Sequence, residues 1–451
     1  MASRGKERTL DESVNDALES VISYHERTKH HPQRYARSPG YLDWANEPEP
    51  FRRFEGSILL ELPFIEKDRE AGHHGLYHRD RNPFHPFTIG AIAAFLELSM
   101  GLSAWKSSQG LSWALRIDPS SGNLHPTEAY LVLPPMPETG GLGGVYHYNP
   151  YLHALEQRAS FDLKFWRPLG EHFGAEGFLV GLSSIPWRES WKYGERAFRY
   201  CNQDIGHAMA GLSFSANLLG WKVACLNAVS DSEIEIILGF EKAIWERFEE
   251  EYPSVLLFVH ESPGKRVPGD LPQELIEPFG TLSYTGEPNR LSRGHREWPV
   301  IGEVSAATRK PRTPERRYRY RDHPLLGEER YGEKAAEIIR KRRSALAYDG
   351  KTSLPREHLF EILDKTIPRS RCAPFDLELG DPAVHLLLFV HRVSGLPSGL
   401  YFLFRNERDI EGITARSHAR FLWERPGNAP GTLPLFLLEK GDFRATGAMA
   451  G

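Results

Sequence analysis

A strand followed by a hairpin occurs twice in this chain, and this repeat constrains the fold more than any other feature. In the first half, the apolar segment 128–133 leads through a Gly-rich turn to VYHY at 145–148. In the second half, an apolar segment from His385 leads through a Ser-Gly-Leu turn to GLYF at 399–402. Such a repeat predicts two related units. The alternative interpretation is a chance similarity between two hairpins.

The second copy is predicted to be incomplete. After Tyr146 the first copy continues for about 115 residues, whereas only about 50 follow Tyr401, too few for the same later elements. Nine prolines between Pro263 and Pro324, with many charges and little periodicity, are typical of a linker or an extended wrap-around segment. The predicted organisation is a first domain, a Pro-rich linker or wrap-around segment and a partial second domain, at residues 1–262, 263–330 and 331–451.

The composition excludes several classes of protein. The chain carries 56 basic and 60 acidic residues, a net charge of −4, so it lacks the cationic field that holds nucleic acid. Its apolar stretches are broken or too short to span a bilayer. Its three cysteines include no C-x-x-C pair, which argues against a disulfide framework or a Cys-type zinc site. We expect a protein of a reducing compartment, the cytoplasm, that binds neither nucleic acid nor membrane.

Hydrophobic periodicity predicts an α+β protein with a mixed or antiparallel sheet flanked by helices. Helices are expected at residues 9–27, 88–100 and 196–219 in the first half, and at 332–344 and 355–366 in the second. Strands are expected at 128–133, 145–148, 178–183 and 254–259. The segment 28–90 is rich in His, Arg, Pro and aromatic residues and is expected to be irregular.

The loop from Arg116 to Pro126 is the first candidate site. Between two prolines it places two hydroxyls, a glycine and an amide, those of Ser120, Ser121, Gly122 and Asn123. Stiff ends, exposed backbone N–H groups and short polar side chains suit a flat ligand. The alternative is an ordinary Asx or Ser turn.

The pair Lys192–Tyr193 is the second candidate. A lysine beside a tyrosine, among several aromatic residues, can supply a base with a perturbed pKa. The alternative is a surface lysine and a half-buried tyrosine at a helix start, with Glu195 and Arg199 forming an i,i+4 ion pair.

The triplet Arg342-Arg343-Ser344 is the third candidate. The guanidinium fork of Arg342 and the hydroxyl of Ser344 can together hold a phosphate. The alternative is a solvated basic helix end that complements the helix dipole.

A metal site is not expected. The histidines at 73, 74 and 78 lack the Cys or carboxylate partners at fixed spacing that metal sites add, and H-E-x-x-H is absent. The Gly-rich turn at 140–144 lacks the Lys-Ser/Thr of a phosphate-binding NTPase loop. There is also no G-x-S-x-G elbow, which argues against a hydrolase.

Taken in order, these segments resemble the nitroreductase superfamily of FMN enzymes. More narrowly, they are similar to the SagB-type dehydrogenases of thiazole/oxazole-modified peptide pathways, in a tandem form. The most specific match is the opening TKHHPQRYARSPGYLDWANEPEPFRRFEG; the others are PSSGNLHPTEAY, KYGERAFRYCNQDIGHA, KRRSALAYDG and GLPSGLYFLFR. The resemblance covers nearly the whole chain.

The resemblance implies a role for each candidate residue. The residues expected along the flavin ring are Ser120, Ser121, Gly122 and Asn123, with Arg116 nearby. The backbone at Leu226 and Asn227 would approach flavin N5, and Arg342 with Ser344 would hold the phosphate. Lys192 and Tyr193 match the pair implicated in azoline oxidation, in which a base removes a proton from the ring carbon while hydride goes to the flavin.

The chain also departs from that family. Leu346 stands where a second basic residue often follows the Arg-x-Ser motif, and the second copy has RSRCAPF where a Ser-Ser-Gly-Asn loop is expected. The resemblance implies a pseudo-dimer within the chain or a homodimer, acting on a modified peptide or another small molecule. Two alternatives stay open: an NAD(P)H-dependent nitro or quinone reductase, and a non-catalytic scaffold that binds a peptide or a partner dehydrogenase.

Overall fold

The computed structural model describes residues 10–31, 33–66, 71–78, 82–261, 266–327 and 332–450. The described chain divides into two compact units. The first comprises residues up to 66 and from 82 to 316; the second comprises residues 71–78 and those from 317 onward. The predicted domain boundaries at 262/263 and 330/331 lie outside the described residues.

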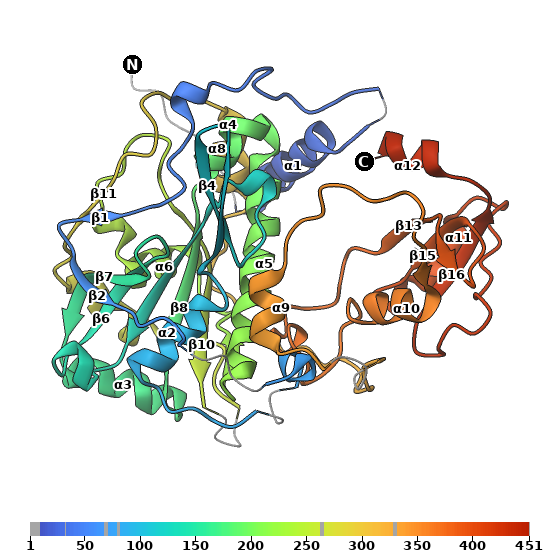
Figure 1. The fold of residues 1–451 in the computed structure, drawn as a ribbon. Coiled ribbons are helices and arrows are strands. Elements are labelled where there is room, and N and C mark those ends of the chain that lie inside the picture. Colours follow the sequence, from blue (N-terminus) through green and yellow to red (C-terminus); the bar gives the residue numbers. More distant parts are fainter. Residues whose placement is uncertain are drawn as a thin grey trace, which may run out of the picture. The chain divides into compact units, whose positions relative to one another are not determined.

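A seven-stranded antiparallel sheet forms the centre of the first unit (Figure 1). Its order is β2-β7-β6-β5-β8-β10-β9, and every neighbouring pair is antiparallel. The strands are β2 (Ile58–Glu61), β7 (Ala154–Phe161), β6 (Gly143–Asn149), β5 (Thr127–Leu133), β8 (Gly177–Ser184), β10 (Tyr252–His260) and β9 (Lys222–Cys225). The four expected strands are β5, β6, β8 and β10, so these predictions are confirmed.

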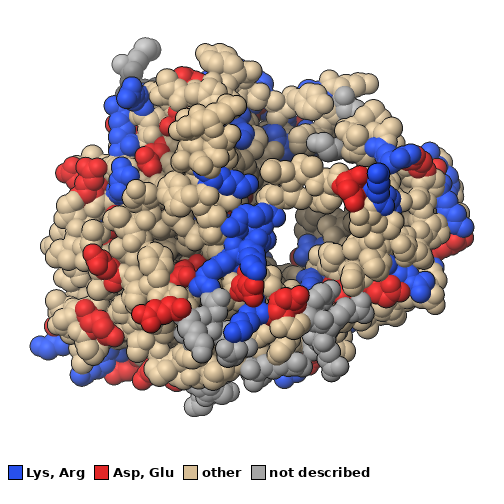
Figure 2. Space-filling view, in the orientation of Figure 1, with Lys and Arg blue, Asp and Glu red and all other residues tan. Residues whose placement is uncertain are grey.

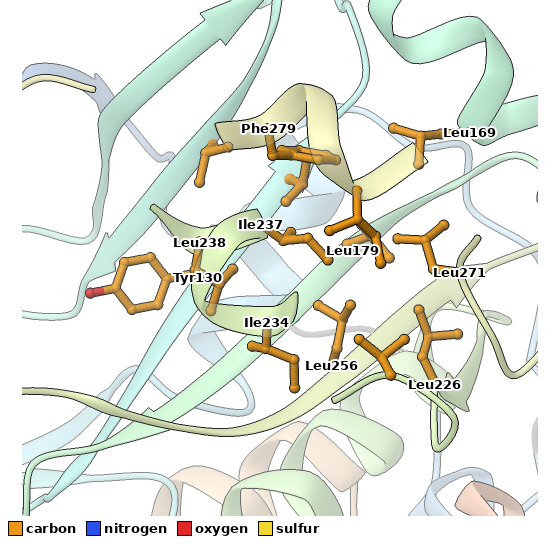
Figure 3. Packing of buried hydrophobic residues seen from close by; sticks show 14 of the residues in the cluster. Tyr130, Leu169, Leu179, Leu226, Ile234, Ile237, Leu238, Leu256, Leu271 and Phe279 are labelled. Atoms are coloured by element: carbon orange, nitrogen blue, oxygen red, sulfur yellow. The ribbon is translucent and has the colours of Figure 1, made fainter. Parts of the chain in front are cut away.

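Helices cover both faces of this sheet. On one face lie α2 (Ile89–Glu97) and α5 (Ala197–Leu218); the Phe95 ring of α2 meets Phe178 of β8 edge to face, with ring centroids 5.8 Å apart. On the other face lie α3 (Leu163–Phe173) and α6 (Asp231–Leu238), whose apolar side chains form one buried cluster with strand residues (Figure 3). Burying an aliphatic side chain contributes about 1.5–3 kcal/mol, so this layered core fixes the sheet. The predicted α+β class is confirmed.

Further helices and strands belong to the first unit. They are α1 (Leu10–Thr28), α4 (Pro186–Tyr193), α7 (Gln273–Ile276), α8 (Pro299–Ala307), the hairpin β3 (Leu102–Ser108) with β4 (Leu111–Arg116), and the pair β1 (Phe54–Glu55) with β11 (Glu287–Pro288). Two of these elements show how the expected Pro-rich linker packs. β11 pairs with β1 and α8 packs against α1, so the Pro-rich segment as far as residue 316 wraps onto the first unit.

The second unit is smaller and contains a three-stranded antiparallel sheet of order β13-β15-β16. Its elements are α9 (Ala335–Lys341), β12 (Leu354–Pro355), α10 (Arg356–Asp364), β13 (Leu386–Val390), β14 (Val393–Ser394), β15 (Gly399–Leu403), α11 (Ile410–Arg416), β16 (Leu435–Lys440) and α12 (Arg444–Ala450). Tyr146 and Tyr401 are both buried, and each lies on a strand paired to the preceding one of its hairpin, β6 to β5 and β15 to β13. That the second unit is a partial copy of the first stays a prediction.

The surface carries both signs of charge. On the face of the first unit seen in Figure 2, Lys and Arg are interspersed with Asp and Glu, as the near-even count of 56 to 60 predicts. Over the described ranges, no helix is long and apolar enough to cross a membrane.

Candidate active site

The loop between β4 and β5 is a stiff platform. Its short turn Ser121–Asn123 contains Gly122 at φ 64°, and Asn123 and His125 also have positive φ angles. The hydroxyl of Ser120 accepts a hydrogen bond from the backbone N–H of His125 at 2.8 Å, and the amide of Asn123 donates to the carbonyl of Ala114 at 2.9 Å. The short polar side chains therefore hold the loop's own shape, as a Ser or Asx turn does.

Helix α5 anchors the tip of this loop. The carboxylate of Asp204, which is buried, accepts from the backbone N–H of Ser121 at 3.1 Å and from the Ser121 hydroxyl at 3.2 Å. Charge-assisted hydrogen bonds of this kind are stronger than neutral ones. The loop is thus fixed at its tip as well as at its two ends, with Gly122 exposed to solvent.

The structure brings Lys192 and Tyr193 to this loop. Both lie at the end of α4, and the amine of Lys192 is 3.5 Å from the carbonyl oxygen of Gly122. A Cβ atom added to Gly122 would lie 2.6 Å from the Tyr193 hydroxyl and 3.1 Å from the Lys192 amine. The two motifs are 70 residues apart in sequence, yet they form one cluster.

Tyr193 remains a phenol at neutral pH. Its burial, followed by the nearby Glu189, raises the pKa of Tyr193 to about 12. A phenol in this state is a hydrogen-bond donor and not a base.

The N-terminal segment holds the turn that follows Lys192 and Tyr193. The backbone N–H of Glu195 donates to the carbonyl of Arg37 at 3.1 Å, and the Tyr24 hydroxyl donates to the carbonyl of Glu195 at 2.7 Å. The Glu195 carboxylate pairs with Arg27 of α1. The Glu195–Arg199 ion pair of the alternative interpretation is therefore not formed: Glu195 pairs with Arg27 of α1, and Arg199 likewise donates to α1. A neighbour distant in sequence overrides the local i,i+4 pairing.

A buried chain of charges lies across the sheet beside this site, and the sequence analysis did not identify it. Arg188 of α4 pairs with Glu128 of β5, Glu128 with His147 of β6 at 3.1 Å, and His147 with Glu156 of β7 at 2.8 Å. Burial alone would lower the pKa of His147, but its hydrogen bonds to Glu128 and Glu156 outweigh burial and raise it to about 9. Likewise, burial would raise the pKa of Glu128, but the Arg188 guanidinium and His147 hold it at about 2. A signal was available in the sequence, since Glu128 and His147 interrupt otherwise apolar or aromatic strands.

Arg116 is placed beside the loop but points into the protein. Its side chain is buried, and it donates to the carbonyl of Thr127 at 3.2 Å and to the carbonyl of Pro50 at 2.6 Å. These bonds tie the start of β5 to the N-terminal segment. In the structure, Arg116 therefore supports the loop from the protein interior.

Leu226 and Asn227 lie elsewhere in the first unit. They follow β9, and β8 and β10 separate β9 from β5 in the sheet. The Leu226 side chain belongs to the buried cluster (Figure 3), and its backbone N–H donates to the carbonyl of Leu256 at 2.9 Å. The side-chain amide of Asn227 donates to the carbonyl of Arg316 at 2.8 Å. The structure does not join these two residues to the loop at Gly122, and their contact with flavin stays a prediction.

Arg342 and Ser344 lie in the second unit, directly after α9, and both are exposed. Two further basic residues, Arg340 and Lys341, occupy the last turn of that helix. This is the arrangement of a solvated basic helix end, and phosphate binding by the pair stays a prediction. Within the described part of the chain, no group of three or more His, Cys, Asp or Glu residues is arranged to hold a metal ion.

Known proteins with similar sequence or structure point to one class. No family model matches the chain. Over 144 residues, 31% of this chain and 67% of its relative, it is 28% identical to a protein of Methanocaldococcus jannaschii that is provisionally named a nitroreductase. The crystal structure of a protein from Anabaena variabilis, also provisionally called a nitroreductase, superimposes with a TM-score of 0.58 at 19% identity, covering 95% of this chain and 80% of that one.

A third similarity is weaker. The Escherichia coli microcin synthetase McbBCD complex, solved with a truncated pro-MccB17 peptide bound, contains a chain that matches with a TM-score of 0.31 at 19% identity, over 57% of this chain and 98% of that one. A score this low says nothing about function. The likeness to the Anabaena variabilis structure confirms the predicted nitroreductase-like fold. The sequence match to the Methanocaldococcus jannaschii protein supports a nitroreductase-like oxidoreductase.

Proposed function

We propose that this protein is an FMN-dependent dehydrogenase of the SagB type that oxidises an azoline ring of a modified peptide, or a related small molecule. The observation that carries the proposal is the cluster of Lys192, Tyr193 and the Gly122 loop. Two segments 70 residues apart, each matching a motif of that family, meet in a nitroreductase-like fold with the amine 3.5 Å from the loop.

The loop residues fit a flat ring such as that of flavin. Gly122 carries no side chain and is exposed, and the hydroxyls and amide beside it are already bonded within the protein. The loop therefore offers backbone and short side chains next to the Lys192 amine. Ser120, Ser121, Gly122 and Asn123 would lie along the ring. That Arg342 and Ser344, in the second unit, hold a phosphate stays a separate prediction. When bound, FMN would supply the hydride acceptor, with dioxygen as the final oxidant.

The chain's own residues handle the proton. In the proposed reaction the unprotonated form of the Lys192 amine would take the proton from the azoline ring carbon, and bound FMN would supply the acceptor for the hydride. The phenol of Tyr193 donates a hydrogen bond that orients the substrate, because its pKa of about 12 keeps it protonated. Arg116 and Asp204 keep the loop in place, since their hydrogen bonds fix its flanks and its tip.

A lysine substitution tests this proposal. In Lys192→Ala we expect FMN to bind as in the wild type but azoline oxidation to fall about 10²–10⁴-fold, the usual contribution of a positioned base. The matched control is Lys164→Ala, which removes an exposed lysine near the start of α3 and leaves the rate unchanged. Wild-type oxidation by Lys192→Ala would contradict the proposed role.

A nitro or quinone reductase is the second candidate, favoured by the sequence similarity to a provisionally named nitroreductase. Bleaching of bound FMN by NAD(P)H, with turnover of a nitroaromatic compound and no azoline oxidation, would select this activity. Tight peptide binding without any redox turnover would instead indicate a scaffold. We also propose that the second unit is a partial copy of the first, so that the chain is a pseudo-dimer. The oligomeric state measured by sedimentation tests this proposal: a homodimer at micromolar concentration would argue for pairing between chains instead.

A further inference from the structure

Arg188 occupies a central position next to the candidate site. It lies on α4, four residues before Lys192, and its side chain is fully buried. Its Nη1 atom donates to the carbonyl of His125 at 2.7 Å and pairs with the carboxylate of Glu128, while its Nε atom donates to the carbonyl of Glu49 at 3.1 Å. One guanidinium therefore joins α4 to the loop, to β5 and to the N-terminal segment.

These contacts connect the two halves of the candidate site. His125 belongs to the loop, because its own N–H donates to the hydroxyl of Ser120 at 2.8 Å. Residues four apart on a helix share one face, so Arg188 and Lys192 lie on the same side of α4. Arg188 contacts the loop at His125, and the Lys192 amine is 3.5 Å from the Gly122 carbonyl of the same loop.

The charge chain keeps Arg188 in this position. Arginine stays protonated and has a planar fork of donors, so it can serve several oxygen atoms at once; lysine is a single point donor. Glu128 is ionised, with its pKa held at about 2, and its other side is bonded to His147. The guanidinium consequently has a fixed, charged acceptor on β5, and turning away would cost that buried carboxylate one of its two charged partners.

We propose that Arg188 is the positioning residue of this site: it holds the Lys192–Tyr193 end of α4 against the Gly122 loop at the distance that catalysis requires. This role rests on the proposed function, which supplies the reaction of Lys192. Arg188 itself touches neither the amine nor the loop tip, so it acts through the backbone of α4 and of His125.

The matched control is Arg52. It is buried to the same extent, pairs with Glu251 at 3.1 Å and donates to the carbonyls of Asn289 and Glu249, both at 2.6 Å. Those partners belong neither to α4 nor to the loop. Arg52→Met and Arg188→Met therefore remove equivalent buried ion pairs, but only the second removes the link between Lys192 and Gly122.

The experiment compares Arg188→Met, Arg188→Lys and Arg52→Met in the full chain. Three properties are measured. They are the stability to urea, the rate at which an amine-reactive reagent modifies Lys192 as monitored by mass spectrometry, and the kcat and KM for azoline oxidation. We expect both Met variants to lose similar stability. In the Arg188 variants only, the rate of Lys192 modification should change at least threefold and kcat should fall at least tenfold. In these variants KM should stay within threefold of the wild-type value. If Arg188→Met does not fold, Arg188→Lys, which keeps the charge, decides the question.

Two results would overturn the proposal: wild-type Lys192 modification in the folded Arg188 variants, or the same changes in Arg52→Met. The modification rates need neither flavin nor substrate. A wild-type protein that shows no oxidation would therefore refute the proposed function, while the comparison of Lys192 modification still decides whether Arg188 positions it.

Discussion

Replacing Gly122 by alanine tests the geometry of the candidate site most sharply. At φ 64° an alanine adopts the left-handed conformation, which costs roughly 1–2 kcal/mol. Its Cβ would also lie 2.6 Å from the Tyr193 hydroxyl, closer than non-bonded atoms approach, and 3.1 Å from the Lys192 amine, which is a tight contact. Tyr193 must therefore move by roughly 1 Å and Lys192 by less, and a misplacement of about 1 Å can reduce a catalysed rate about 10²-fold.

The control for this experiment is Gly174→Ala. Gly174 ends α3 at φ 60°, so an alanine there has the same backbone strain, but its Cβ meets nothing within 4 Å. Urea unfolding should show that both variants lose roughly 1–2 kcal/mol. The assay is azoline oxidation per mole of folded protein, in which only Gly122→Ala should be slow. Equal rates for the two variants, whether both fast or both slow, would refute the reasoning.

Three further predictions concern the interior. Because the pKa of His147 is raised to about 9 in the folded protein, protonated His147 should contribute roughly 3 kcal/mol to the free energy of unfolding. This contribution should be present in full below about pH 6.5 and disappear as the pH rises through 9. Urea unfolding measured against pH should show the fall in stability, and His147→Gln should abolish it. Glu189 is buried, and both its carboxylate oxygens lack a partner among the described residues, so Glu189→Leu should raise the free energy of unfolding by roughly 1–3 kcal/mol; a loss of stability would mean that the carboxyl has a partner. Tyr24→Phe removes the donor to the carbonyl of Glu195 and should cost about 1 kcal/mol and speed amide exchange in α1, and unchanged exchange there would show that this bond does not hold the N-terminal helix.

Local sequence predicted the strands β5, β6, β8 and β10 and the helices α1, α2 and α5, because their residues have the composition or spacing typical of a strand or a helix. The cores of β5, β6, β8 and β10 and the long helix α5 are all found where expected. The strand β2 was missed because it is an edge strand of only four residues within a His- and Pro-rich segment. The pairing of β8 with β10 joins residues 68 to 83 positions apart, and no local pattern encodes such an order.

The two motifs of the candidate site were predictable from the sequence, but the ion pairs that hold them in place were not. The Gly122 loop and the Lys192–Tyr193 pair have residue types that suggest chemistry on their own, and the structure unites them. By contrast, the partners of Arg188 and Glu195 come from segments 60 or more residues away, so local spacing suggested the wrong ion pair for Glu195 and none for Arg188. Buried charges are matched by tertiary contacts, which a single sequence does not display.

The visible absorption spectrum of the purified protein, followed by titration with FMN, tests the central proposal most directly. A flavin enzyme of the proposed kind shows flavin absorption bands as isolated, or takes up added FMN with a saturable change in spectrum. A protein that shows no bands and binds no added FMN would contradict the proposal, whatever the positions of Lys192 and the Gly122 loop.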